Sequence, residues 1–406
     1  MQYDLIVVGG GAAGFFGAIQ AAEMKPELKI LILEKTNKVL SKVRVSGGGR
    51  CNVTHHDYNP FSLARHYPRG EKALKNIFKT YHAEHVVKWF ASKGVLLKAE
   101  NDGRMFPVTD SSETIIECFL KEAQRYNVKI ETGSSVDSIA TALDGFHVSL
   151  TSGAAYKATK VLIASGGNPN LQAYAWIKNL QHSIAVPIPS LFTFNNSTKT
   201  FSDLMGIAVS FGEIRIEGTK FAQRGPILIT HWGLSGPAVI KLSAWAAEYL
   251  HSVNYTFTAL VNWVGRSEED VRANMLEWKS EKSRQKVMTD SLFGLPQRLS
   301  RRVCEQAEVE ESRTWSELSM KSINKLVEML IRTPFYIKGK TTFKEEFVTC
   351  GGVQLSDVDL ATMESKKIKN IFFAGEVLNI DGETGGFNFQ SAWSTAFVAA
   401  KAIVAE

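Results

Sequence analysis

The pattern of apolar and polar positions at the start of the chain predicts a βαβ unit. Residues 5–8 form a branched apolar run, typical of a buried parallel strand, and the glycine-rich turn GGGAAG at residues 9–14 follows at once. Residues 12–23 then supply a helix, and a second apolar run at residues 29–33 ends in an acidic residue. This order of elements predicts a Rossmann-like α/β domain built on a parallel sheet.

The turn carries the dinucleotide fingerprint GxGxxG. Gly9 permits the tight turn, Gly11 lets a pyrophosphate approach the backbone, and Gly14 lets the helix lie close to the strand. The helix N-terminus faces the phosphates, and Glu34, at the end of the second strand, accepts hydrogen bonds from ribose hydroxyls. The fingerprint predicts a dinucleotide site but does not distinguish NAD from FAD.

Two further apolar runs place both ends of the chain in one domain. Residues 161–164 and 371–374 complete a parallel sheet only if the ends meet, so the middle of the chain is an insertion. Short apolar runs between turns predict a β-rich part, and Ser267 begins a stretch with helical periodicity. The expected units are an FAD-binding domain (1–188 and 340–406), a β-rich insert (189–266 and 333–339) and a helical insert (267–332).

Two more glycine-rich segments favour FAD. Ser46, three glycines and Arg50 predict a backbone-lined loop that lies against a flat or anionic ligand. Residues 381–390 precede a helix expected at 390–405. Backbone N–H groups of Phe387 and Asn388 would stabilise the negative charge that reduced flavin carries at N1 and the C2 carbonyl. An NAD dehydrogenase has no need for this second closure.

Composition narrows the functional classes. The chain has 406 residues, 44% hydrophobic and 22% charged, with a net charge of +6 spread along its length, so no nucleic-acid partner is expected. The four cysteines lie far apart without a CxxC pair, which argues against a zinc or dithiol site. Neither a signal peptide nor a membrane-length apolar run is found, so the expected location is the cytoplasm, away from membranes.

Other candidate sites have simpler interpretations. His82 and His85 lie at i and i+3 of an expected helix without a third ligand nearby, so no metal site is predicted. The turn at residues 231–237 places Pro237 at the start of a helix whose N–H groups face either a cleft or an ordinary turn. The flavin carries the chemistry, so the sequence leaves the catalytic residues unassigned.

A series of motifs in order gives the chain a specific resemblance. They are GGGAAG (9–14), SGGGRCNVT (46–54), GRMFPV (103–108), LIASGG (162–167), THWGLSGPAV (230–239), TCGGV (349–353), TMESK (362–366) and FFAGEVLNIDGETGGFNFQSAW (372–393). With them the chain resembles the BaiN/YhiN-like family of NAD(P)/FAD-dependent oxidoreductases, whose flavin domain is similar to the glutathione-reductase and p-hydroxybenzoate-hydroxylase superfamily. Departures from the family pattern at Ser165, His55 and Ser356-Asp357 leave the phosphate-binding glycines intact.

The resemblance implies an FAD domain that carries a barrel-like insert with a helical portion. It also implies main-chain contacts from Val136 to the adenine. Together the motifs and the resemblance give these predicted cofactor-binding residues: Gly9, Gly11, Ala12, Ala13, Gly14, Glu34, Lys35, Arg44, Ser46, Gly47, Gly48, Arg50, Cys51, Asn52, Val136, Ala164, Ser165, Gly166, Gly375, Glu376, Gly385, Gly386, Phe387 and Asn388.

The expected reaction is hydride transfer through flavin N5 to or from a small organic substrate, because the substrates associated with the family are enones and amino ketones. Without a second GxGxxG turn, NAD(P)H as reductant would visit the same cleft transiently. Two alternatives stay open: a non-catalytic flavin or redox sensor, and an RNA-modifying flavoenzyme. The sequence gives no indication of the oligomeric state.

Overall fold

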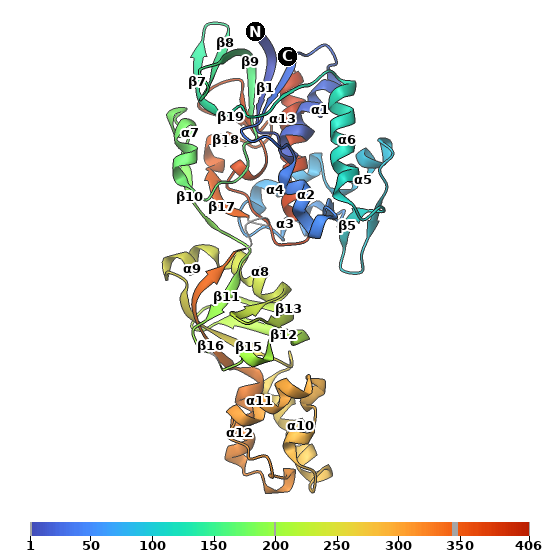
Figure 1. The fold of residues 1–406 in the computed structure, drawn as a ribbon, viewed down its shortest axis with the longest axis vertical. Helices are drawn as coiled ribbons and strands as arrows, with labels where there is room; N and C mark the ends of the chain where they lie inside the picture. Colours follow the sequence, from blue (N-terminus) through green and yellow to red (C-terminus); the bar gives the residue numbers. More distant parts are fainter. Residues whose placement is uncertain (1, 199, 343–347, 406) are drawn as a thin grey trace. The chain divides into compact units, whose positions relative to one another are not determined.

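The computed structural model describes residues 2–198, 200–342 and 348–405. The chain divides into two compact units, Met1–Ser190 with Phe343–Glu406 and Leu191–Thr342 (Figure 1). Residues 343–347, which the sequence analysis assigned to the FAD-binding domain, lie outside the described residues. Each unit has its own buried core.

The first unit is organised by a sheet whose central strands are parallel. β1 (Gln2–Val8) lies between β2 (Ile30–Leu33) and β9 (Ala155–Ile163), and β20 (Ile371–Phe373) pairs in parallel with β9. The order is β18-β19-β20-β9-β1-β2-β6, and a meander of β7 and β8 pairs with β9. The prediction that both chain ends meet in one parallel sheet is therefore confirmed. The remaining strands of this sheet are β6 (Lys129–Glu131), β7 (Val136–Ala142), β8 (Gly145–Leu150), β18 (Val358–Asp359) and β19 (Glu364–Ser365).

Two helices from opposite ends of the chain pack together in this unit. α1 (Ala12–Met24) and α13 (Phe387–Val404) approach closely, since a Cβ built on Gly17 would lie 3.6 Å from that of Ala396 (Figure 1). The other helices are α2 (Ser41–Gly49), α3 (Pro60–Ala64), α4 (Glu71–Thr80), α5 (Ala83–Ser92), α6 (Ser112–Arg125) and α7 (Ala175–Asn179). Two smaller sheets join β3 (Thr54–His55), β5 (Arg104–Pro107) and β4 (Leu97–Ala99), and β10 (Ile184–Pro189) with β17 (Thr349–Val353).

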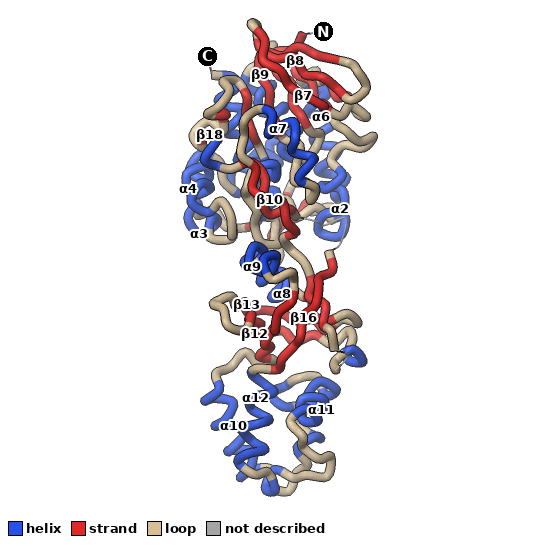
Figure 2. Tube along the Cα trace, turned by 90° about the vertical axis from the view of Figure 1, so that its left-hand side faces the viewer, coloured by secondary structure: helices blue, strands red, loops and turns tan. Residues whose placement is uncertain are grey.

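The second unit contains a closed barrel in the order β11-β14-β13-β12-β15-β16. α8 and α9 lie at one end of the barrel, and α10, α11 and α12 lie at the other (Figures 1 and 2). Barrel strands and these helices share one hydrophobic core. The bounds are β11 (Thr193–Asn196), β12 (Ala208–Ile216), β13 (Ala222–Ile229), β14 (Gly233–Ser235), β15 (Thr256–Asn262), β16 (Thr333–Thr341), α8 (Pro237–Trp245), α9 (Ala247–Ser252), α10 (Glu268–Glu281), α11 (Gln297–Gln306) and α12 (Met320–Ile331).

Local signals located helix starts better than strand limits. Ser267 caps α10 by accepting a hydrogen bond from the Asp270 N–H, and Pro237 opens α8, both as predicted. The apolar runs at residues 207–211 and 213–217 predict two short strands, but residues 208–216 form the single strand β12, whose pairing register shifts between Val209 and Gly212. Such a shift in register bends a strand and interrupts the alternation of apolar and polar residues. The sequence pattern therefore predicts two strands where the structure has one. No described helix is both long enough and apolar enough to cross a membrane.

Candidate functional site

The glycines of the first turn serve two different physical purposes. A Cβ on Gly9 would lie 2.3 Å from the Ala164 carbonyl oxygen, and one on Gly14 would lie 1.9 Å from the Gly9 carbonyl oxygen. Those two glycines are required by packing. A Cβ on Gly11 would meet nothing within 4 Å, so the backbone at the start of α1 borders open space. An open backbone at a helix N-terminus fits a pyrophosphate group.

The acidic residue after β2 is held against that turn. One carboxylate oxygen of Glu34 accepts from the Gly10 N–H at 2.8 Å, and the other accepts from the N–H and hydroxyl of Thr36 at 2.9 and 2.8 Å. The oxygen that accepts only from Gly10 keeps a second acceptor position, so the fixed side chain can still accept from a ribose hydroxyl. Lys35, the neighbouring candidate, is exposed.

The ends of β9 and β20 bring further candidate residues to the same turn. Ala164 packs against Gly9, Ser165 is exposed, and a Cβ on Gly166 would meet nothing within 4 Å. Gly375 donates its N–H to the Thr395 hydroxyl at 2.9 Å, and a Cβ there would lie 2.7 Å from that of Ala13.

Glu376 links three separate segments. Its carboxylate accepts from the Thr349 N–H at 2.9 Å and from the Lys42 ammonium at 2.6 Å. A Cβ on Gly167 would lie 2.7 Å from the same carboxylate, so the segment after β9 also passes close by. The acid therefore joins β17, the segment after β9 and the start of the 41–54 segment.

The predicted glycine loop at residues 46–50 follows a helical turn that the sequence did not predict. The 41–54 segment begins as helix α2, and the helical conformation breaks at Ser46, Gly47 and Gly48, where the φ angles of the two glycines are 59° and 68°. Such left-handed positions favour glycine. Cβ atoms on Gly48 and Gly49 would meet nothing within 4 Å, so this backbone is also open to a neighbouring group. The helical turn was missed because three glycines in sequence predict irregular backbone.

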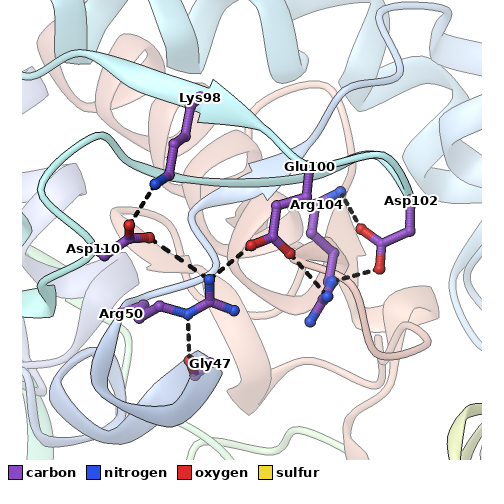
Figure 3. A network of polar contacts seen from close by, with 7 residues as sticks. All are labelled: Gly47, Arg50, Lys98, Glu100, Asp102, Arg104 and Asp110. Atoms are coloured by element: carbon purple, nitrogen blue, oxygen red, sulfur yellow. Dashed lines mark hydrogen bonds and ion pairs between the residues drawn. The ribbon is translucent and has the colours of Figure 1, made fainter.

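Arg50 is committed to a network of charged side chains (Figure 3). Its guanidinium lies 2.7 Å from Glu100, 3.6 Å from Asp110 and 4.0 Å above the centre of the Phe106 ring. Its Nε donates to the Gly47 carbonyl at 3.4 Å. We therefore propose that Arg50 positions the glycine loop, and its predicted contact with the cofactor stays a prediction.

Arg44 and Cys51 also have partners within the protein. Arg44 forms an ion pair with Glu113, on α6. The Cys51 side chain is fully buried, and burial raises the pKa of its thiol to about 12. The thiol is therefore protonated at neutral pH and enclosed by protein, so any cofactor contact of Cys51 would be made by its backbone.

Asn52 connects the two glycine-rich segments. With its amide oriented by its neighbours, its side-chain oxygen accepts from the Gly386 N–H at 3.0 Å and its nitrogen donates to the Thr54 carbonyl at 3.1 Å. The Trp393 indole N–H donates to the Val53 carbonyl at 2.9 Å. The candidate segments 46–52 and 385–388 are thus side by side, although more than 300 positions separate them in sequence.

α13 begins at Phe387, three residues earlier than expected, with Gly386 at its N-cap. Within the described residues, the N–H groups of Phe387 and Asn388 donate to no hydrogen bond. Asn388 uses its side chain instead, accepting from the Gly382 N–H at 2.9 Å and donating to the Gly382 carbonyl at 3.0 Å. Free N–H groups at the start of a long helix fit an electron-rich group.

Gly386 is required by the protein itself. Its φ is 91°, and a Cβ would lie 2.5 Å from the Thr54 carbonyl oxygen. We expect Gly386→Val to destabilise the cofactor-free protein by about 1–3 kcal/mol through backbone strain and collision. Thermal unfolding of that form measures the effect. An unchanged melting temperature would mean that the 385–388 loop is free to move away from β3.

Val136 begins β7 beside the segment that holds Glu34. The N–H groups of Gly133 and Ser134 donate to the carbonyls of Thr36 and Glu34 at 3.0 and 2.8 Å. The predicted main-chain contact of Val136 with adenine stays a prediction.

The two histidines considered as metal ligands, and the 231–237 turn, make hydrogen bonds within the protein. His82 caps α5 by accepting from the Glu84 N–H, and His85 accepts from the His82 N–H at 3.1 Å. Within the described residues, no group of three or more His, Cys, Asp or Glu side chains is placed to hold a metal ion. The 231–237 turn lies in the second unit, where Trp232 donates to the Thr193 hydroxyl at 3.1 Å.

Three residues that contact the 376–387 segment were not predicted as site residues, because no sequence motif marks them. Lys42 reaches Glu376, Tyr67 donates to the Phe387 carbonyl at 2.5 Å, and His66 lies 3.2 Å from Glu383. Each pair joins residues more than 300 positions apart, beyond the reach of any local motif.

Comparison with known proteins identifies the family. The HI0933-like protein Rossmann domain matches residues 3–402. The chain belongs to this family. Membership confirms the resemblance and the Rossmann-like fold drawn from the sequence, and it confirms the predicted class of FAD-dependent oxidoreductase.

Two relatives are similar to this chain along almost their whole length. The 3-dehydro-bile acid delta(4,6)-reductase of Clostridium scindens is 25% identical over 405 residues, 98% of each chain. The ribosomal RNA dihydrouridine synthase of Escherichia coli is 27% identical over 414 residues, 100% of this chain and 98% of the relative. Because this second relative is named for ribosomal RNA, the expectation that the chain has no nucleic-acid partner stays unconfirmed.

A solved structure shares the fold. The 3-ketosteroid-delta4-(5alpha)-dehydrogenase of Rhodococcus jostii RHA1 superposes with a TM-score of 0.52 at 15% identity, covering 98% of this chain and 97% of that chain.

Proposed function

We propose that this family member binds FAD and reduces a carbon–carbon double bond conjugated to a carbonyl group. The observation that supports FAD binding is the open backbone at Gly11, Gly48 and Gly166 together with the free N–H groups that begin α13. This arrangement offers a helix N-terminus and unobstructed glycines to an anionic, flat cofactor, as FAD requires.

The residues present suit each part of FAD. The 9–14 turn would hold the pyrophosphate and Glu34 the adenosine ribose, with Val136 beside the adenine. The 46–52 and 385–388 segments would hold the flavin ring, where N–H groups of Phe387 and Asn388 stabilise negative charge. Bound FAD supplies a carrier that accepts and donates hydride.

The type of substrate is inferred from the names of the two relatives. A delta(4,6)-reductase of a 3-dehydro steroid acts on double bonds in conjugation with a ketone, and dihydrouridine is uridine with its ring double bond saturated. Both bonds are conjugated to a carbonyl, so hydride addition at the far carbon is the shared chemistry. We favour a small enone over an amino ketone for this reason.

A uracil ring in RNA is the second candidate substrate, favoured by the full-length similarity to the dihydrouridine synthase. Scattered charge and a net charge of only +6 are arguments against a large RNA interface. RNA binding with a steep salt dependence would support this candidate.

The test is a two-step anaerobic experiment. NADH or NADPH is mixed with the FAD-loaded protein, and bleaching of the flavin absorbance reports reduction. A 4-en-3-one steroid, or ribosomal RNA, is then added. We expect the colour to return and the acceptor to gain 2 Da. Persistent bleaching with every conjugated acceptor would contradict double-bond reduction, and absence of bleaching with both nicotinamides would exclude them as reductants.

A further inference from the structure

A group of ring and acid side chains surrounds the first residue of α13. The Phe387 ring stacks with two imidazoles, with centroids 4.6 Å from His55 and 4.2 Å from His66 and interplanar angles of 26° and 12°. The two imidazole centroids are 5.9 Å apart, so the three rings form one cluster. Phe387 is buried, and its N–H is the first of the helix that the proposed function sets against the flavin ring. Both imidazoles therefore contact the side chain of the residue that begins this helix.

The two histidines are held in different ways. Nδ1 of His66 lies 3.2 Å from Oε2 of Glu383, and the Glu383 N–H donates to the His66 carbonyl at 2.9 Å. A carboxylate only accepts hydrogen bonds, so Nδ1 of His66 carries a proton and Nε2 is the nitrogen left for transfer. Within the described residues Nε2 has no hydrogen-bond partner, and a third of the side chain is exposed while Glu383 is 8% exposed.

His55 is unsuited to donating a proton. Its Nδ1 donates to the Gly385 carbonyl at 3.1 Å, and its Nε2 faces Gly103, where a Cβ would lie only 2.4 Å away. Burial lowers the pKa of His55, and the nearby His66 acts in the same direction. His55 is therefore neutral near pH 7 and its second nitrogen is covered.

We propose that His66, oriented by Glu383, is the general acid of the reduction. The proposal rests on the proposed function. As the conjugated double bond is reduced, the carbon far from the carbonyl receives hydride from the reduced cofactor. The carbon next to the carbonyl receives a proton from Nε2 of the His66 imidazolium. The π bond is lost, two C–H bonds form, the cofactor is oxidised, and neutral His66 regains its proton from solvent through its exposed edge.

The test separates proton donation from packing. His66→Phe keeps a ring against Phe387 but has no proton to give, and His66→Ala opens a space that added imidazole can fill. The control is His56→Ala, because His56 is exposed and, among the described rings, contacts only Tyr58, edge to face. Each variant is measured for FAD content, rate of flavin bleaching by reductant, and rate of reoxidation by a 4-en-3-one steroid or ribosomal RNA.

We expect FAD content and bleaching to be unchanged in all variants. Reoxidation should slow by about 100-fold or more in His66→Phe and His66→Ala. Imidazole should restore His66→Ala but not His66→Phe, and His56→Ala should behave as wild type. Independently of turnover, nitrogen NMR of the cofactor-free protein should show a proton on Nδ1 of His66 that Glu383→Ala releases.

Two results would overturn the proposal, and they distinguish failure of the acid role alone from failure of the proposed function. If wild type reduces a conjugated acceptor and His66→Phe does so equally fast, His66 only packs against Phe387 while the proposed function stands. If wild type reduces no conjugated acceptor, the proposed function fails and the acid role fails with it. An unprotonated Nδ1 in the NMR measurement would contradict the pairing with Glu383.

Discussion

Gly11→Val should produce a folded protein that has lost its FAD. The backbone at Gly11 has φ −93° and ψ −167°, which valine adopts readily, and no protein atom lies within 4 Å of the added Cβ. The valine side chain would occupy the space assigned to the pyrophosphate. We expect FAD affinity to fall by roughly 100-fold or more, which corresponds to about 2.7 kcal/mol. Titration of cofactor-free protein with FAD measures the change.

Gly14→Val is the matched comparison three residues along. A Cβ there would lie 1.9 Å from the Gly9 carbonyl oxygen, so this variant should lose stability even without cofactor, by about 1–3 kcal/mol or more. Thermal unfolding should therefore separate the two glycines, with Gly11→Val close to wild type and Gly14→Val lowered. Full FAD affinity in Gly11→Val would show that the pyrophosphate lies elsewhere.

Asp381→Ala should cause a large loss of stability in the first unit. Asp381 is fully buried and forms a two-pronged ion pair with Arg69, whose side chain is 10% exposed, with Nε 2.6 Å from Oδ1. The Ser190 hydroxyl donates to the same carboxylate at 2.7 Å. Removal of the acid leaves the guanidinium buried without this carboxylate, at a cost of about 3–5 kcal/mol. Urea denaturation measures the loss.

Two further variants test the cause. Arg69→Met combined with Asp381→Leu removes both charges and should recover much of the loss, because no charge then stays buried. Glu84→Ala breaks the exposed pair between Glu84 and Lys88 and should change stability by about 0.5 kcal/mol or less. If Asp381→Ala costs no more than Glu84→Ala, the ion pair does not fasten the 381–388 loop.

Where local chemistry determines structure, the sequence was sufficient. The 9–14 turn, the strands beside it and the cap at Ser267 follow from glycine, apolar and hydroxyl residues at fixed spacing, and the structure places elements there. The need to pair residues 371–374 with 161–164 also follows from the apolar pattern, because a lone parallel strand cannot satisfy its backbone.

Contacts between distant segments could not be predicted. The Asn52 amide reaches Gly386, and Glu383 reaches His66, across more than 300 positions each, and neither pair has a characteristic spacing. The partners of Arg50 could not be predicted for the same reason, since the acidic residues Glu100 and Asp110 belong to another part of the chain. A basic residue beside glycines looks the same in sequence whether it contacts a phosphate or a carboxylate.

The identity of the released cofactor tests the central claim most directly. Protein purified without added flavin is denatured, and the flavin in the supernatant is separated and quantified against the chain concentration. The 9–14 turn and Glu34 bind a pyrophosphate and an adenosine ribose, both of which FMN lacks, so we expect FAD at about one per chain. Release of FMN alone, or a colourless protein that FAD cannot reconstitute, would contradict the account.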